Sequence, residues 1–174
     1  LTLSCAACAA FRAGPNERCV RALFKEMKMG REVRRVPADW QHPKNEYDRY
    51  KPLYPGERYE ANATGFMEKA NAEGLQEAID LYGQAPDQND YMPNWPVSER
   101  THYMMYEDTS EGTPISPAFA TPEELARWLA DTGASSVGSA TASYEGWLRV
   151  AKGGWAPSAV SIGGGPLVSG VDAL

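Results

Sequence analysis

The stretch from residue 101 to residue 129 constrains the fold most, because a strand, a polar loop and a strongly capped helix follow one another there. Thr121 stands three residues before Glu124, which is the spacing of a capping box, and Pro122 occupies the first helical position. These signals predict a helix from Pro122 to Asp131. We expect this stretch to be the centre on which the rest of the chain folds, because its local signals all agree.

The segment before this helix has the alternation of a strand. Side chains of a strand point alternately to its two faces, so residues 102–108 place Tyr106 and Asp108 on one face and Met105 and Glu107 on the other. Apolar residues occur on both faces. We therefore expect the middle of this strand to be covered on each side.

A further helix is predicted from about Gly65 to Tyr82, where apolar residues recur at fourfold spacing. Thr64 is expected to cap its start and Gly83 to end it. Gly74 lies in its middle and predicts a weak point or a kink.

The C-terminal part predicts one more helix and a hairpin. The helix is expected to begin at Thr141 or Ser143 and to end at Gly153. Two apolar runs, residues 155–162 and 166–171, are separated by three glycines and predict a terminal hairpin.

The N-terminal part predicts extended and irregular structure. Residues 29–35 alternate Val33 with charged residues, which indicates an edge strand or an extended arm; the alternative is a small basic patch. Four prolines in residues 37–60 prevent a regular central strand or a long helix. We expect the aromatic residues of this segment to pack on the body of the domain, and the alternative is that they are exposed for recognition. They are Trp40, Tyr47, Tyr50, Tyr54 and Tyr59.

Together these elements predict an α+β fold. A small antiparallel sheet, made of the strand near 101–108 and the C-terminal hairpin 155–171, is expected to pack with two or three helices. An irregular aromatic and proline-rich arm precedes them. A hydrophobic content of 43% is sufficient for one core, so residues 29–174 are predicted to form a single domain with an extended N-terminal arm at 29–62.

Residues 1–28 are interpreted as a leader that is not part of the native protein. The chain begins with Leu1 instead of Met. The codons of Lys25 and Glu26, six nucleotides before the Met29 codon, can read AAGGAG, which is a bacterial ribosome-binding sequence. All three cysteines, Cys5, Cys8 and Cys19, lie in this leader. A zinc site needs four ligands, and a redox pair is expected beside a βαβ pattern, so we predict neither a metal nor a cofactor.

Composition narrows the class of partner. The net charge of −6 argues against a general affinity for nucleic acid, because phosphate is bound by Lys and Arg. An acidic surface suits a basic partner, or simply solubility. The chain has no apolar run long enough to cross a bilayer, and Arg12 follows the N-terminal apolar run instead of preceding it as in a signal peptide. We therefore expect a soluble, cytoplasmic protein without a membrane partner.

Acidic and aromatic loop residues are the candidate binding residues. Glu107, Asp108 and Glu111 form the sharpest carboxylate cluster, which can hold a cation or receive an arginine from a partner, although such runs are commonly solvated turns. Tyr91 and Trp95 add an apolar patch in the loop 84–100. No catalytic residue is predicted, because His102 has no carboxylate or nucleophile at a fixed partner position.

Three segments carry a resemblance. They are MGREVRRVPADW from Met29, MYEDTSEGTPISPAFATPEELARWLADTGA from Met105, and YEGWLRVAKGG from Tyr144. Together they resemble a family of small uncharacterised proteins encoded by bacteriophages and prophages. Longer relatives carry paired CxxC zinc-knuckle motifs before the SEGTP block, and this chain has no cysteines there. The resemblance implies a phage origin, but no activity and no catalytic residues.

These observations favour a non-enzymatic accessory protein that binds and modulates a host or defence protein with a basic surface. A CRISPR effector is one such partner, and an acidic surface can compete for its nucleic-acid channel. Two alternatives stay open. The first is a metal-dependent enzyme that uses His102, Asp108 and Glu111. The second is a virion assembly protein, although the repeats or coiled coils expected of one are missing.

Overall fold

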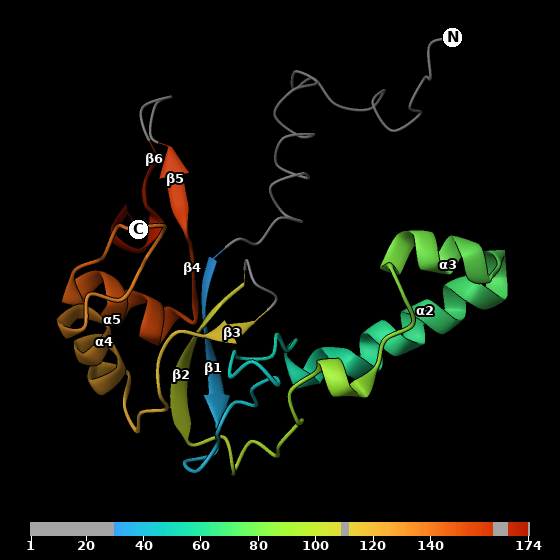
Figure 1. Cartoon of the computed structure of the whole chain (residues 1–174), viewed down its shortest axis with the longest axis horizontal. Coiled ribbons are helices and arrows are strands. Elements are labelled where there is room, and N and C mark those ends of the chain that lie inside the picture. Colours follow the sequence, from blue (N-terminus) through green and yellow to red (C-terminus); the bar gives the residue numbers. More distant parts are fainter. Residues whose placement is uncertain (1–29, 109–111, 162–166, 174) are drawn as a thin grey trace, which may run out of the picture.

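The computed structural model describes residues 30–108, 112–161 and 167–173, and its centre is a four-stranded antiparallel sheet (Figure 1). The strand order is β3-β2-β1-β4. Helices cover one face of the sheet and an irregular arm covers the other. The predicted α+β class is confirmed. The strands of this sheet are β1 (Gly30–Val36), β2 (His102–Glu107), β3 (Thr113–Pro114) and β4 (Trp155–Pro157).

The position of β1 corrects the prediction of an edge strand or loose arm. β1 is a central strand, paired with β2 on one side and with β4 on the other. The charged residues of β1 indicated an exposed strand, but two of them are buried, since Arg31 and Arg34 are only 4% and 8% exposed. The Nε of Arg31 donates to the Ser135 carbonyl at 3.1 Å, and its Nη1 lies 3.6 Å from the Glu107 carboxylate. Long charged side chains can be buried in this way when their polar ends are satisfied.

Two helices, α4 (Pro122–Asp131) and α5 (Tyr144–Gly153), cover the face of the sheet that carries Met105. The predicted capping box of α4 is confirmed, since Thr121 Oγ1 accepts from the Glu124 N–H and Glu124 Oε2 accepts from the Thr121 N–H, each at 3.2 Å. Of the two predicted starts of α5, Ser143 is right, because its Oγ accepts from the Gly146 N–H. The core on this face contains fully buried side chains, which are Met105, Leu125, Leu129 and Trp147.

The opposite face of the sheet is covered by the irregular arm. Tyr106 of β2 is fully buried there, and its hydroxyl contacts His42 Nδ1 at 3.2 Å and accepts from Trp40 Nε1 at 3.3 Å. The expected covering of the middle of β2 on both faces is therefore confirmed. The expected packing of the aromatic residues holds for Trp40 but fails for Tyr47, which is 74% exposed.

The predicted single helix of residues 65–82 is two helices, α2 (Tyr59–Glu73) and α3 (Leu75–Tyr82). The expected weak point at Gly74 is the break, where φ is +115°, a conformation that glycine adopts without strain. Thr64 lies inside α2 and is not its cap. The two helices pack on each other through Phe66 and Ala78, and they project from the body as a helical hairpin (Figure 1).

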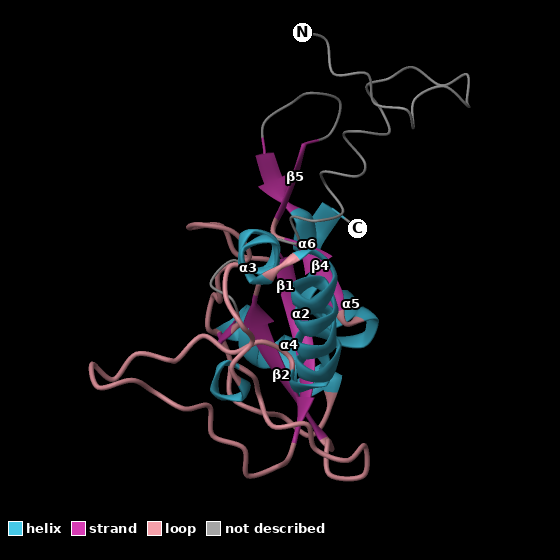
Figure 2. Ribbon diagram, turned by 90° about the vertical axis from the view of Figure 1, so that its right-hand side faces the viewer, coloured by secondary structure: helices cyan, strands magenta, loops and turns pink. Residues whose placement is uncertain are grey.

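The predicted C-terminal hairpin forms between residues 159–161 and 167–169, but it is shorter than predicted and lies outside the main sheet. Only β4 joins the main sheet, and it pairs with β1. Pro157 ends β4, because proline has no N–H to donate to a neighbouring strand. The chain then forms a separate two-stranded sheet, which extends away from the main sheet (Figure 2). The remaining elements are β5 (Ala159–Ser161), β6 (Leu167–Ser169), α6 (Gly170–Ala173) and two short 3-10 turns, η2 (Gly56–Arg58) and η3 (Gln88–Asp90).

The buried core and the projecting hairpin predict different responses to truncation. Leu129→Ala is expected to lower the free energy of unfolding by about 3 kcal/mol, because it leaves a cavity beneath α4. Leu75→Ala removes a side chain that is 61% exposed, and a change below about 0.5 kcal/mol is expected. Urea denaturation of both variants measures this difference. Equal losses would contradict the placement of the core.

Candidate functional site

A network of carboxyl, guanidinium and indole groups lies on the arm-covered face of the sheet. The register of β1, β2 and β4 places the groups of this network side by side. Glu32 of β1 is directly opposite Tyr106 of β2 on one side and Trp155 of β4 on the other. Asp108 follows Tyr106 by two residues and so lies on the same face. Sequence positions far apart are thus brought to one place by cross-strand pairing.

The guanidinium of Arg34 is the buried centre of this network. Its Nε donates to Glu32 Oε2 at 3.0 Å, and its Nη1 donates to the Leu53 carbonyl of the arm at 2.6 Å. The same group lies over the ring of Tyr106, 4.4 Å from its centroid. Gly112 also approaches closely: a Cβ at that position would collide with the Leu53 carbonyl oxygen and lie 2.6 Å from Arg34 Nη2, and φ there is +96°. The backbone at residue 112 therefore requires glycine.

Asp108 is the most perturbed carboxyl group in the network. Burial raises its pKa to about 6, and the neighbouring Glu32 carboxylate adds to the effect. Trp155 Nε1 opposes it by donating to Asp108 Oδ2 at 2.9 Å. Two like charges that are partly removed from water favour holding one proton between them. Asp108 can therefore take up or release a proton close to neutral pH.

The structure divides the predicted carboxylate cluster. Asp108 faces Glu32 on the arm side, whereas Glu107 lies on the helix side with Arg31, 3.6 Å from its Nη1. The cause is the alternation of strand side chains. Glu111 lies outside the described residues.

The two predicted aromatic residues have different surroundings. Tyr91 is 8% exposed, with its hydroxyl accepting from Asn62 Nδ2 at 2.9 Å and its ring against Tyr54, so it has little surface for a partner. Trp95 is partly exposed and packs edge-on against Trp40, with ring centroids 4.7 Å apart. Trp95 also lines a cavity beside Arg34.

His102 lies at the far end of β2 from Asp108. The two are six residue steps apart along the strand, which is roughly 20 Å. His102 Nδ1 is instead 2.9 Å from Thr101 Oγ1. These two residues therefore cannot bind one metal ion together. Within the described ranges, no three His, Cys, Asp or Glu side chains are grouped as a metal site.

Sequence reasoning missed Glu32, Arg34 and Trp155 as site residues. The only local signal was the alternation of charged residues around Val33, which was interpreted as an exposed edge. Finding the network needs the register between β1, β2 and β4, because Glu32 and Arg34 lie on β1, Trp155 lies on β4 and Asp108 directly follows β2.

Comparison of the chain with known proteins finds no relative. No protein-family model, curated protein or solved structure matches the chain significantly. The resemblance to phage-encoded proteins therefore stays a prediction. Among the helices of the described residues, none has the length and apolar character needed to cross a membrane.

The raised pKa of Asp108 predicts a stability effect that depends on pH. The folded state binds this proton more tightly than the unfolded chain, so the stabilisation is present at low pH and is lost as the pH rises from about 4 to about 6. Asp108→Asn keeps an acceptor for the Trp155 indole and removes the charge. At pH 7 it should raise the free energy of unfolding by about 1 kcal/mol, a value reduced for solvent screening.

Urea denaturation between pH 4 and pH 7.5 measures this effect. Asp131→Asn, at an exposed position on α4, is the matched control and should change the curve little. If the difference in free energy of unfolding between D108N and the parent did not grow between pH 4 and pH 7, Asp108 would not be held in this environment.

Proposed function

We propose that this chain is a non-enzymatic accessory protein, encoded by a phage or prophage, that binds a basic surface of a host or defence protein and modulates it. The phage origin rests on the three segments of resemblance. The mode of binding rests on the helical hairpin formed by α2 and α3.

The helical hairpin, residues 59–82, carries much of the acidity of the chain. It holds five acidic residues and one basic residue, a net charge of −4, against −6 for the whole chain. The single basic residue, Lys69, is paired with Glu73 at 2.6 Å. The acidic residues are all exposed: Glu60, Glu68, Glu73, Glu77 and Asp80. Such a one-signed surface steers a basic partner toward it.

Exposed apolar side chains lie on the same two helices. Met67, Leu75 and Leu81 are 57%, 61% and 63% exposed, and Tyr82 is 41% exposed. Apolar groups within a charged surface supply the desolvated contacts that dominate binding energy, while the charges around them direct the approach. This combination is the observation that carries the proposal.

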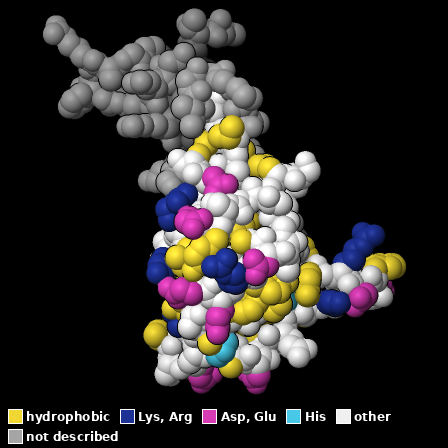
Figure 3. All heavy atoms as spheres, turned by 90° about the vertical axis from the view of Figure 1, so that its left-hand side faces the viewer, with side chains coloured by type: hydrophobic (Ala, Val, Ile, Leu, Met, Phe, Trp, Pro, Cys, Tyr) yellow, Lys and Arg dark blue, Asp and Glu magenta, His cyan; other side chains and the backbone are white. Residues whose placement is uncertain are grey.

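The helix-covered side of the body differs in character. Figure 3 views that side and shows side chains of both charges interspersed with hydrophobic ones. α4 and α5 together hold four acidic and three basic residues, a net charge of −1. Lys152 and Glu123 are paired there at 2.7 Å. This side therefore lacks the one-signed charge of the helical hairpin.

One observation favours the enzyme alternative. Asp108, whose pKa is raised to about 6 by burial and by the neighbouring Glu32 carboxylate, has the protonation behaviour of a general acid or base near neutral pH. This pair differs from the metal-dependent set of His102, Asp108 and Glu111. A Glu32→Gln, Asp108→Asn protein separates the two functions, because a binding protein keeps its full biological effect and an enzyme that uses this pair loses it.

Neutralising the helical hairpin tests the binding function. The variant carries Glu68→Gln, Glu77→Gln and Asp80→Asn. We expect one stoichiometric bacterial protein with a basic surface to co-purify with the parent chain from infected or prophage-bearing cells. Its affinity for the variant should fall by about tenfold at low salt, because three favourable charges are lost, and added salt should weaken the parent complex. Titration calorimetry with the purified partner measures both effects.

A matched variant, Glu123→Gln, Asp131→Asn and Glu145→Gln, removes the same charge from α4 and α5 and should bind like the parent. Equal losses in both triple variants would show that only net charge matters. A partner that binds all three proteins equally, or the lack of any stoichiometric partner, would overturn the proposed binding surface.

A further inference from the structure

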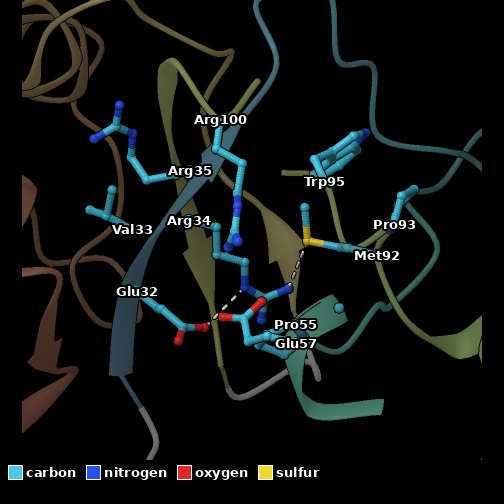
Figure 4. A pocket seen from close by; sticks show the side chains of 11 residues that line it. Glu32, Val33, Arg34, Arg35, Pro55, Glu57, Met92, Pro93, Trp95 and Arg100 are labelled. Carbon is cyan, nitrogen blue, oxygen red and sulfur yellow. Dashed lines mark hydrogen bonds and ion pairs between the residues drawn. The ribbon is translucent and has the colours of Figure 1, made fainter. Parts of the chain in front are cut away.

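A small cavity beside the carboxyl network contains a guanidinium, that of Arg100, which forms no ion pair within the described part of the chain. It has a volume of about 160 Å³ and lies between β1, the η2 turn and the loop before β2 (Figure 4). The side chains that matter for its chemistry are Glu32, Arg34, Glu57, Met92, Trp95 and Arg100.

Arg100 has a buried donor without a partner among the described residues. Its Nε is buried and has no hydrogen-bond partner in the described residues, and it forms no ion pair with any of them. Figure 4 shows the side chain of Arg100 pointing into the cavity beside Arg34. A guanidinium has five N–H donors and no acceptor, so only an acceptor can satisfy it. An acceptor that is also an anion does so most strongly.

The second guanidinium in the cavity is already engaged. Arg34 donates to Glu32 and to the Leu53 carbonyl. Arg35 lines the cavity only along its backbone side, because its side chain points away in Figure 4 and its guanidinium lies over the ring of Tyr103. The inward charges are therefore two guanidinium groups and the carboxylates of Glu32 and Glu57. Arg34 is paired with Glu32, whereas Arg100 and Glu57 form no ion pair among the described residues, and of these two only Arg100 has a buried polar atom without a hydrogen-bond partner there.

Apolar groups form the rest of the wall. Met92 is buried, Trp95 is partly exposed, and Pro55 and Pro93 line the same cavity. A cavity of this volume is similar to one that holds a molecule the size of benzene. The site thus suits a compact group that has one anionic end and a short aliphatic stem.

We propose that this cavity binds a carboxylate presented by a peptide, either an acidic side chain or a chain end, with Arg100 as its ionic partner and Trp95 and Met92 against its aliphatic stem. A monovalent carboxylate fits better than a phosphate, because Glu32 and Glu57 repel a second negative charge more strongly. The planar fork of the guanidinium also matches a carboxylate in bidentate geometry. This site is independent of the helical hairpin and of its partner.

Nuclear magnetic resonance titration of the full chain tests the site. The probes are N-acetyl-glutamate N-methylamide for a side-chain carboxylate, N-acetyl-alanine for a chain end, the uncharged N-acetyl-glutamine N-methylamide, and inorganic phosphate. Saturable shifts of the Arg100 Nε–H and the Trp95 indole N–H are expected with at least one carboxylate probe. The glutamine probe should cause none, and phosphate should bind more weakly.

Variants assign the binding to Arg100. Arg100→Gln should weaken carboxylate binding by about tenfold or more, and Glu57→Gln should strengthen it by removing a repulsive charge. Arg127→Gln removes an exposed guanidinium on α4 and should bind like the parent. If R100Q fails to fold, the response of E57Q still tests the site.

Three results would overturn the proposal. The first is no saturable shift with either carboxylate probe, or the same shift with the glutamine probe. The second is tighter binding of phosphate than of both carboxylates, which would assign the cavity to a different anion. The third is unchanged carboxylate binding in a folded R100Q protein, or in E57Q where R100Q does not fold.

Discussion

The burial of the Arg34 guanidinium on the sheet is the constraint on which the arm side of the molecule depends. A charged group removed from water needs partners at its polar atoms. Here they are the Glu32 carboxylate on the same strand, the Leu53 carbonyl of the arm and the face of the Tyr106 ring. Because one of these partners belongs to the arm, the arm must lie over the sheet even though it has little regular structure. The close approach of Gly112 follows from the same guanidinium.

The two faces of the sheet therefore serve different purposes. The helix face is sealed by an apolar core around Trp147, Leu125 and Leu129, and it supplies stability. The arm face combines buried polar groups with irregular backbone, which leaves cavities and unneutralised donors. The Glu32 and Asp108 pair and the Arg100 cavity both lie on that side. Titratable groups and unpaired donors are found on the face with polar packing, because close apolar packing leaves no polar group available for binding or proton transfer.

Net charge is a poor guide to the local charge of this protein. The chain has a net charge of −6, and the helical hairpin alone carries −4. Yet the Arg100 cavity holds an unpaired cation within the described residues. An acidic surface for a basic partner and a pocket for a carboxylate are therefore compatible in one molecule. The acidic surface lies on α2 and α3, whereas the cavity lies between β1, η2 and the loop before β2.

The sequence by itself determined the elements whose signals are local. The capping box at Thr121 and Glu124 and the break at Gly74 depend on neighbours within one helical turn, whereas the sequence left the start of α5 open between Thr141 and Ser143. Tertiary structure alone decided that β1 is central, that Asp108 meets Glu32 while Glu107 meets Arg31, and that Tyr91 is buried while Trp95 lines a cavity. The physical reason is that strand register and arm packing join residues more than 60 positions apart, and no local spacing encodes which distant partner satisfies a buried charge.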